Sequence, residues 1–185
     1  MLLLLTTLAI TFALPLSADS KTPTYQEIEW IALMPHEDLE ALMNPPEYLT
    51  EIPDGSKLDS VKAFTDKPLE DERARRFQEA LVSAQIVPTF KDEAIRIPGF
   101  IVPLQSDEQQ RVTEFFIVPY FGACLHMPPP PNQIIYASHA DGIELKNLYD
   151  PFWFEGTLEI SLQTHDMGTA AYKLKLDRAF PFEGE

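Results

Sequence analysis

From Ile86 onward, apolar and polar residues alternate with a period of two, which is the pattern of half-buried β-strands. The alternation is clearest in FWFEGTLEISLQ and AAYKLKL, and because the turn signal HDMG separates them they predict a hairpin. Two earlier strands share the motif Phe-Ile-Val-Pro and are joined by the polar connector SDEQQR. NQIIYAS predicts another strand, with a turn at residues 140–142. We therefore expect five or more short antiparallel strands in residues 86–180.

Glycine and proline positions suggest how these strands are arranged. Gly99 and Gly156 lie inside predicted strands, where glycine often marks a bulge or a corner of a curved sheet. Pro103 and Pro119 cannot donate to a sheet ladder, so we expect them at strand ends, edges or bulges. The predicted fold is mainly β with an N-terminal helical extension. Its core is a small antiparallel barrel similar to the oligonucleotide/oligosaccharide-binding (OB) barrel, and a small β-sandwich is the alternative.

Residues 19–85 form the predicted extension, because their apolar residues recur at helical spacing or are interrupted by loop signals. The stretch PHEDLEALM predicts a short helix with proline and acidic residues in its first turn. Residues 69–85 predict a second helix, whose apolar face carries Phe77, Leu81 and Ala84. Residues 52–67 are rich in Pro, Asp, Gly and Ser, and are expected to form a long loop.

The first 18 residues have the pattern of a secretory signal peptide. An apolar run from Leu2 to Leu14 is followed by a proline and small residues before the first charge, Asp19. An uncleaved anchor is the alternative, but the run is shorter than the ~20 residues that a membrane span requires. We therefore expect a periplasmic protein, with no integral membrane segment after removal of the signal peptide.

The net charge limits the class of partner. The chain has 14 basic and 29 acidic residues, which gives a formal net charge of −15. Such a charge repels nucleic acid backbones and anionic lipid surfaces. We therefore expect no nucleic acid partner.

The motif GACLHMPPPPNQ holds the only cysteine of the chain, Cys124, two residues before His126. If the preceding strand continued through it, both side chains would share one face with Cα atoms about 7 Å apart, close enough to bind one zinc or copper ion. His139 is a candidate further ligand. Two alternatives stay open: a buried thiol, which is the ordinary role of a free cysteine and which we rank first, and a nucleophile paired with His126 or His139.

The prolines of the same motif predict a stiff polyproline II segment, which serves either as a structural brace or as a recognition surface. A binding surface built on this segment would also use nearby aromatic and amide side chains. Its candidate residues are Tyr120, Phe121, Pro128, Pro129, Pro130, Pro131, Asn132, Gln133 and Trp153.

The run VPYFGACLHMPPPPNQIIY, preceded by IRIPGFIVPL and followed by GTLEI and AAYKLKL, resembles the bacterial domain-of-unknown-function family numbered 3299. The resemblance covers residues 86–176. It implies a small exported protein or lipoprotein, and some members are encoded beside components of ABC-type transporters, including zinc-regulated systems. It implies no established reaction. This chain has no cysteine near residue 18 to carry a lipid.

We therefore expect a periplasmic, non-enzymatic accessory protein whose partner is an envelope protein or a component of an ABC-type transporter. Zinc, bound by Cys124 and His126, is the one cofactor considered. One alternative is a structural protein-binding module that receives its partner on the surface named above. The other is an enzyme that uses Cys124 as nucleophile and a histidine as base.

Overall fold

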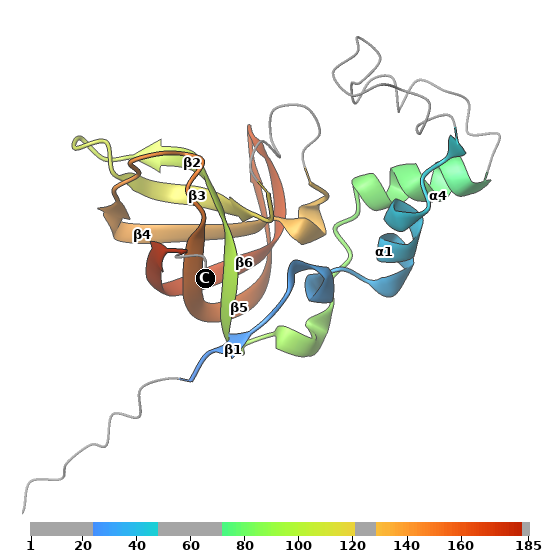
Figure 1. The fold of residues 1–185 in the computed structure, drawn as a ribbon, viewed down its shortest axis with the longest axis horizontal. Coiled ribbons are helices and arrows are strands. Elements are labelled where there is room, and N and C mark those ends of the chain that lie inside the picture. Colours follow the sequence, from blue (N-terminus) through green and yellow to red (C-terminus); the bar gives the residue numbers. More distant parts are fainter. Residues whose placement is uncertain (1–23, 48–71, 121–128, 183–185) are drawn as a thin grey trace, which may run out of the picture.

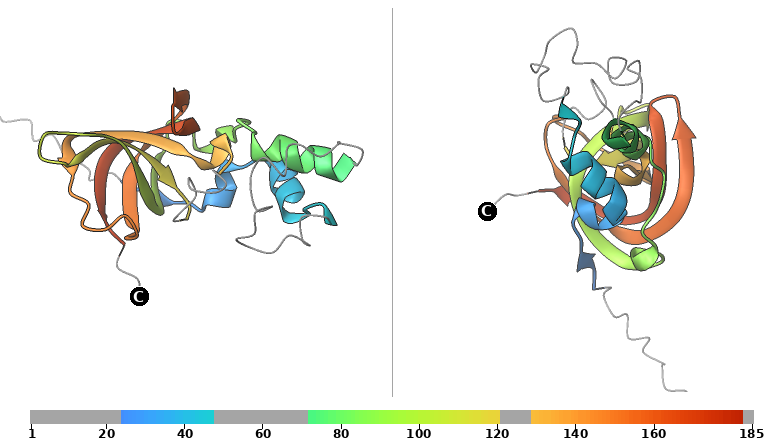
Figure 2. Two further views of the ribbon diagram at one scale, coloured as in Figure 1. Left: turned by 90° about the horizontal axis from the view of Figure 1, so that it is seen from above. Right: turned by 90° about the vertical axis from the view of Figure 1, so that its right-hand side faces the viewer.

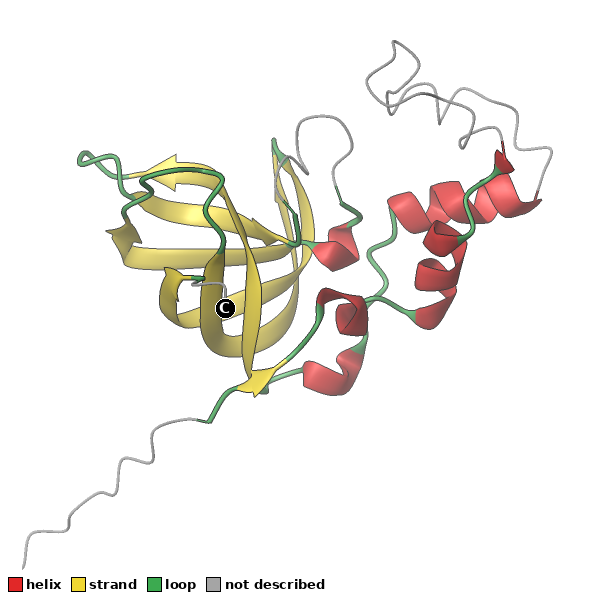
Figure 3. Cartoon of the chain, in the orientation of Figure 1, coloured by secondary structure: helices red, strands yellow, loops and turns green. Residues whose placement is uncertain are grey.

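The computed structural model describes residues 24–47, 72–120 and 129–182. Five strands, β2 to β6, form a closed barrel, which occupies the left of Figure 1 and is yellow in Figure 3. Their bounds are β2 Ala94–Ser106, β3 Val112–Val118, β4 Ile135–Ile143, β5 Phe152–His165 and β6 Gly168–Pro181. The predicted signal peptide, the predicted loop of residues 52–67 and the Cys-x-His pair lie outside the described residues.

The barrel has the order β2-β3-β4-β6-β5, and β5 pairs with β2 to close the ring. The prediction of a mainly β, OB-like barrel with a helical extension is confirmed. The alternative of a small sandwich is wrong, because the strands close on themselves. One pair differs from the prediction of antiparallel strands, since β4 and β6 run parallel.

The inward-facing residues of the five strands form one core. In β3 the alternation places Phe115 and Ile117 inside, and both are fully buried. Ile95 and Ile97 of β2 and Phe154 of β5 are equally buried, and the rings of Phe115 and Phe154 lie 6.0 Å apart between centroids. Burial of each such side chain contributes about 1.5–3 kcal/mol. The alternation with a period of two in the sequence therefore predicts which residues form the main apolar core.

Two glycines allow the barrel to curve, as the sequence predicted. β2 pairs with β5 through Gly99 and with β3 from Phe100 onward, and a Cβ on Gly99 would lie 2.8 Å from Ile117 Cγ2. Gly156 lies at a register shift between β5 and β6, where a Cβ would collide with the backbone oxygen of Lys175. The prolines also follow the prediction. The register of the β2–β3 pair shifts directly after Pro103, and Pro119 follows Val118, the last residue of β3.

β4 continues through the predicted turn at residues 140–142 and ends only at Ile143. Val112 of β3 pairs with Ile143, but Glu114 pairs with Ser138, so residues 139–142 bulge out of the ladder. Gly142 has φ +67°, a left-handed conformation that glycine adopts without strain. The turn signal in the sequence therefore marks a bulge within a strand.

The N-terminal extension combines a short strand, 3₁₀ turns and two helices. The bounds are β1 Gln26–Glu27, η1 Trp30–Leu33, α1 His36–Met43, α4 Glu72–Leu81 and η2 Pro88–Phe90, and a further 3₁₀ turn, η3 Pro131–Gln133, precedes β4. Figures 1 and 2 show α1 and α4 side by side at one end of the barrel. None of the helices in the described part of the chain is long and apolar enough to cross a membrane.

The second predicted helix is shorter at its C-terminal end than expected. α4 buries Ala74, Phe77 and Ala80, a stripe at helical spacing. It ends at Leu81, and Ala84, which was predicted on the buried face, is exposed. After Leu81 the backbone leaves the helix, because Ser83 turns toward the barrel and its carbonyl accepts a hydrogen bond from the backbone of η3.

Candidate functional site

The segment with Cys124 and His126 is outside the described residues, so their role as metal ligands stays a prediction. His139 lies four residues along β4 from Ile135, which pairs with Ile117 near the end of β3. Four residues span about 13 Å of strand, so His139 lies away from the end of β3 that leads into that segment. Among the described residues, no group of three or more His, Cys, Asp or Glu side chains could hold a metal ion.

Part of the predicted binding surface faces inward. Pro129 and Pro130 are buried, and Asn132 and Gln133 are 0% and 6% exposed. Asn132 and Gln133 bond to residues of the N-terminal extension, and none of the four side chains presents a free surface. Tyr120, in contrast, is 50% exposed. Pro131 is half-buried, and two other residues of the set, Phe121 and Pro128, lie outside the described residues.

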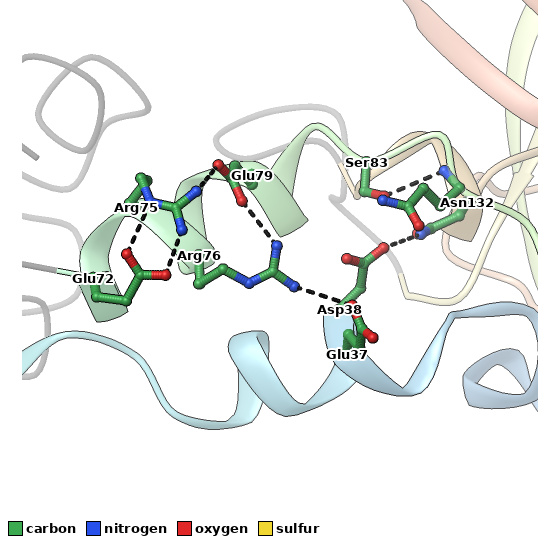
Figure 4. A network of polar contacts seen from close by, with 9 residues as sticks. Glu37, Asp38, Glu72, Arg75, Arg76, Glu79, Ser83 and Asn132 are labelled. Carbon is green, nitrogen blue, oxygen red and sulfur yellow. Dashed lines mark hydrogen bonds and ion pairs between the residues drawn. The ribbon is translucent and has the colours of Figure 1, made fainter.

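A buried polar contact joins α1 to η3 (Figure 4). Asn132 Nδ2 donates to Asp38 Oδ2 at 3.0 Å, and the backbone N–H of Asn132 donates to the carbonyl of Ser83 at 3.2 Å. Asp38 is only 3% exposed although it is a carboxylate. Its position in the first turn of α1 also places it at the positive end of the helix dipole. The amide that the sequence suggested for a surface therefore holds the two parts of the molecule together.

Further hydrogen bonds connect the same regions. Gln133 Nε2 donates to the carbonyl of Trp30 at 2.9 Å. The Tyr172 hydroxyl donates to the carbonyl of Leu33 at 2.8 Å and accepts from the backbone N–H of Val87 at 2.7 Å. Burial raises the pKa of Tyr172, so its hydroxyl stays protonated and able to donate. These contacts assign a structural role to this end of the barrel.

Trp153, another predicted surface residue, is half-buried by contacts within the chain. The Arg96 guanidinium lies 3.9 Å from the centroid of the Trp153 ring. The Phe182 ring is tilted against the Trp153 ring, with the two centroids 5.0 Å apart. Glu155, which is 5% exposed, forms ion pairs with Arg96 and Arg178. The charge of the buried carboxylate is thus balanced by two guanidinium groups, and Trp153 contributes to a packed cation–π cluster.

The described structure has a second apolar region, on the outside of the barrel, which we call the outer apolar face. Four of its members are fully or nearly fully buried, and four are partly exposed along β2 and β4. The outer apolar face consists of Phe116, Val118, Ile134, Ala170, Phe100, Val102, Leu104 and Tyr136. Its four partly exposed members make this face a candidate interaction site. Its sequence signal is the uninterrupted apolar run FFIV at residues 115–118, which leaves no polar side for solvent.

The tip of the β5–β6 hairpin lies against this face. The His165 ring meets the Phe116 ring edge-on, with centroids 6.4 Å apart. A register shift after Ile160 marks an irregularity in the hairpin before its tip. Leu162 and Met167 are 63% and 50% exposed, so the hairpin adds further apolar surface.

Tyr136 gives the outer apolar face a polar group. Burial raises its pKa, and a hydrogen bond to Glu114 raises it further. The phenol therefore remains protonated across the neutral range and presents a hydroxyl next to a carboxylate. A ligand of this face would meet apolar side chains together with an acidic group.

The comparisons with known proteins agree with this architecture. The family model described as a protein of unknown function (DUF3299) matches residues 30–181. The chain belongs to the DUF3299 family. A crystal structure of a DUF3299 family protein from Pseudomonas aeruginosa PAO1 is similar, with a TM-score of 0.61 and 29% identity over 88% of this chain and 99% of that chain. A search of curated proteins found no match.

The family match covers both parts of this DUF3299 protein. It begins at Trp30, in η1, and ends at Pro181, the last residue of β6. The α1–α4 pair and the barrel are therefore both included in the family match, and buried contacts join them. The sequence-based recognition of the family is confirmed.

Proposed function

We infer that this DUF3299 protein is a non-enzymatic accessory protein of the periplasm that holds a protein partner on its outer apolar face. The observation that carries the proposal is the row of partly exposed apolar side chains on β2, Phe100, Val102 and Leu104, beside Tyr136 on β4. Apolar and aromatic side chains with few charges at the centre are typical of protein interfaces.

The charge of the chain indicates the chemistry of that partner. Glu114 lies beside Tyr136, and the hairpin tip carries Asp166, in a chain of net charge −15. A partner segment with apolar side chains flanked by lysine or arginine would complement this surface, and opposite charges would speed association. We propose that this segment belongs to a component of an ABC-type transport system, as the family resemblance implies.

Photocrosslinking in cells tests the partner. A benzophenone amino acid at position Leu104 reports on the outer apolar face, and the same amino acid at the exposed Lys175 of β6 is the matched control. We expect position 104, but not 175, to give a crosslinked product that contains an envelope transport protein, and Val102→Asp to abolish it. Equal products from both positions, or a product insensitive to Val102→Asp, would contradict the proposal. A crosslink to a second copy of the chain would replace it with self-association.

The zinc contact at Cys124 and His126 is a separable part of the proposal. Calorimetric titration of the mature chain from Asp19, under reducing conditions and without a histidine tag, is the test. We expect one zinc per chain. The affinity for zinc should fall by about tenfold or more in both Cys124→Ser and His126→Ala, and should be unchanged in His165→Ala. Absence of zinc binding in the wild type would remove zinc and leave the partner proposal standing.

A further inference from the structure

The two ends of the barrel differ. The end where β4 begins is covered by η1 and η3, and Leu33 of η1 is fully buried in the barrel core. At the other end, where β4 and β6 finish, there is a pocket of about 470 Å³. A volume of this size is within the range of small-molecule sites.

The wall of this barrel-end pocket is largely apolar. Phe152, which is 7% exposed, belongs to the barrel core, and Phe182 forms another part of the wall. The backbone N–H of Phe182 donates to the carbonyl of Pro151 at 2.8 Å, which fixes the chain after β6 beside the start of β5. The pocket therefore has a preformed apolar wall that suits a ring or a branched hydrocarbon.

His139 lines the pocket from the bulge of β4. Within the described structure its Nδ1 atom is buried and has no hydrogen-bond partner. Buried polar atoms in folded proteins are nearly always paired, so an orphan atom on a residue that lines a pocket indicates a missing partner. Bulges commonly redirect a side chain toward a site, and the bulge here depends on Gly142, where a Cβ would lie 2.6 Å from Arg111 Cβ.

The charges on the pocket wall favour a cation. Glu144 and Asp150 supply two carboxylates against one ammonium group, that of Lys146. A hydrogen bond from Asn147 Nδ2 to Asp150 Oδ1, at 3.3 Å, orients the Asp150 carboxylate. In its neutral form with the proton on Nε2, His139 accepts a hydrogen bond at Nδ1. Because Nδ1 has almost no exposed surface, the His139 ring must turn toward the pocket before an ammonium group can donate to this atom and to a carboxylate at once.

We propose that the barrel-end pocket binds a small organic cation, an amine with an apolar and preferably aromatic body. The ring packs against Phe152 and Phe182, and the ammonium group donates to His139 Nδ1 and to the carboxylates of Glu144 and Asp150. This site lies at the barrel end and does not include residues of the outer apolar face. It goes beyond the partner-binding function, and either proposal can fail without the other.

Titration with matched probes tests the site. The full mature chain, uniformly labelled with nitrogen-15, is titrated in phosphate buffer with 2-phenylethylamine, and separately with 2-phenylethanol and 3-phenylpropionate. We expect saturable amide shifts at His139, Asp150 and Phe182 with the amine, at a dissociation constant on the order of 1 mM, as suits a probe with few heavy atoms. The alcohol and the carboxylate should bind at least about tenfold more weakly.

Variants separate pocket binding from general charge attraction. His139→Leu and the pair Glu144→Gln/Asp150→Asn should each weaken amine binding about fivefold or more. The pair Glu93→Gln/Asp166→Asn removes the same charge from exposed positions outside the pocket wall and should leave binding unchanged. His139→Gln, which keeps a polar atom, replaces His139→Leu if that variant loses its dispersed spectrum. Absence of saturation by the amine, equal binding of 3-phenylpropionate, or equal weakening by the control pair would overturn the proposal.

Discussion

At the residue scale, single atoms decide where this barrel curves. Gly156 lies where β6 crosses β5 so closely that no side chain fits between the backbones. Its neighbour Thr157 is half-buried and has no such restriction. Glycine is therefore needed because two backbones approach each other here. A backbone moves aside for a new methyl group less readily than a flexible side chain does.

Gly156→Ala should reduce the free energy of unfolding by about 1–3 kcal/mol, because the new methyl group forces the backbone of β6 away. Urea denaturation monitored by circular dichroism measures the loss. Thr157→Ala is the control and should cost less. Equal stability of Gly156→Ala and the wild type would show that the strands separate freely at this point.

The Tyr136 phenol supplies a pH prediction for the outer apolar face. Its pKa in the folded chain lies above the ordinary value of 10.0, because of burial and of Glu114. A group whose pKa rises on folding stabilises the fold below its unfolded pKa, and that contribution is lost as pH rises through the folded value. The stability difference between the wild type and Tyr136→Phe should therefore be constant at neutral pH and shrink above pH ~10.

Carbon-13 labelling of the tyrosine rings measures the titration directly. The Tyr136 resonance should titrate above the ordinary value of 10.0, and Glu114→Gln should lower the Tyr136 pKa toward that value. An unchanged titration in Glu114→Gln would show that the carboxylate does not act on the phenol.

At the element scale, the contact between α1 and η3 depends on a carboxylate and an amide that are both buried. Asp38 and Asn132 are 3% and 0% exposed, and Asn132 Oδ1 is a buried atom with no hydrogen-bond partner within the described structure. Burying polar groups costs free energy unless they pair. The pair therefore fixes how the helices meet the barrel more than it adds to net stability.

Asn132→Ala should destabilise the protein by about 1–3 kcal/mol or more, because it leaves the Asp38 carboxylate buried without its donor. Adding Asp38→Ala should recover part of that loss, since the unpaired charge is then gone. Guanidinium denaturation of the two single variants and the double variant completes the cycle. Strictly additive effects would mean that the two side chains do not interact. Ser161→Ala on β5 is a control outside this contact.

The strands and both helices were predictable because they follow from local periodicity. Phe115 and Ile117 face inward as the alternation requires, and Gly99 and Gly156 mark bends as predicted. What the sequence did not reveal depends on contacts between distant residues. The C-terminal end of α4 is set by the approach of Ser83 to Asn132, which is 49 positions away along the chain. No local pattern distinguishes an amide that faces a buried carboxylate from one on a surface.

The site residues show the same division. Trp153 was correctly placed on a strand, but its partner Arg96 comes from another strand, and only the closed register brings guanidinium and ring within 3.9 Å. The barrel-end pocket was also not predicted, because it forms where β4 and β6 end and β5 begins. Its one sequence signal is the dipeptide Asp141-Gly142, which was interpreted as a turn.

At the scale of the whole molecule, the extension and the barrel share one core. Ile28 and Leu33, from before α1, are 5% and 0% exposed and belong to the same cluster as the barrel strands. Trp30 and Phe90 pack against that cluster, and Trp30 Nε1 donates to the carbonyl of Pro98 at 2.6 Å. The end of the barrel that these residues close would otherwise expose its apolar interior to water.

A chain that begins at Ala94 should therefore fail to fold as an independent barrel, whereas a chain that begins at Thr24 should unfold cooperatively like the mature protein. Leu33→Ala in the mature protein should cost about 2–5 kcal/mol, because it opens a cavity in the shared core. Near-ultraviolet circular dichroism and thermal unfolding distinguish these outcomes. Met43→Ala, at a position 72% exposed, is the control and should be neutral. A cooperative transition and native-like spectrum from the chain beginning at Ala94 would mean that the extension is an attachment. The barrel would then be the folding unit, and the buried contact between Asp38 and Asn132 would serve positioning alone.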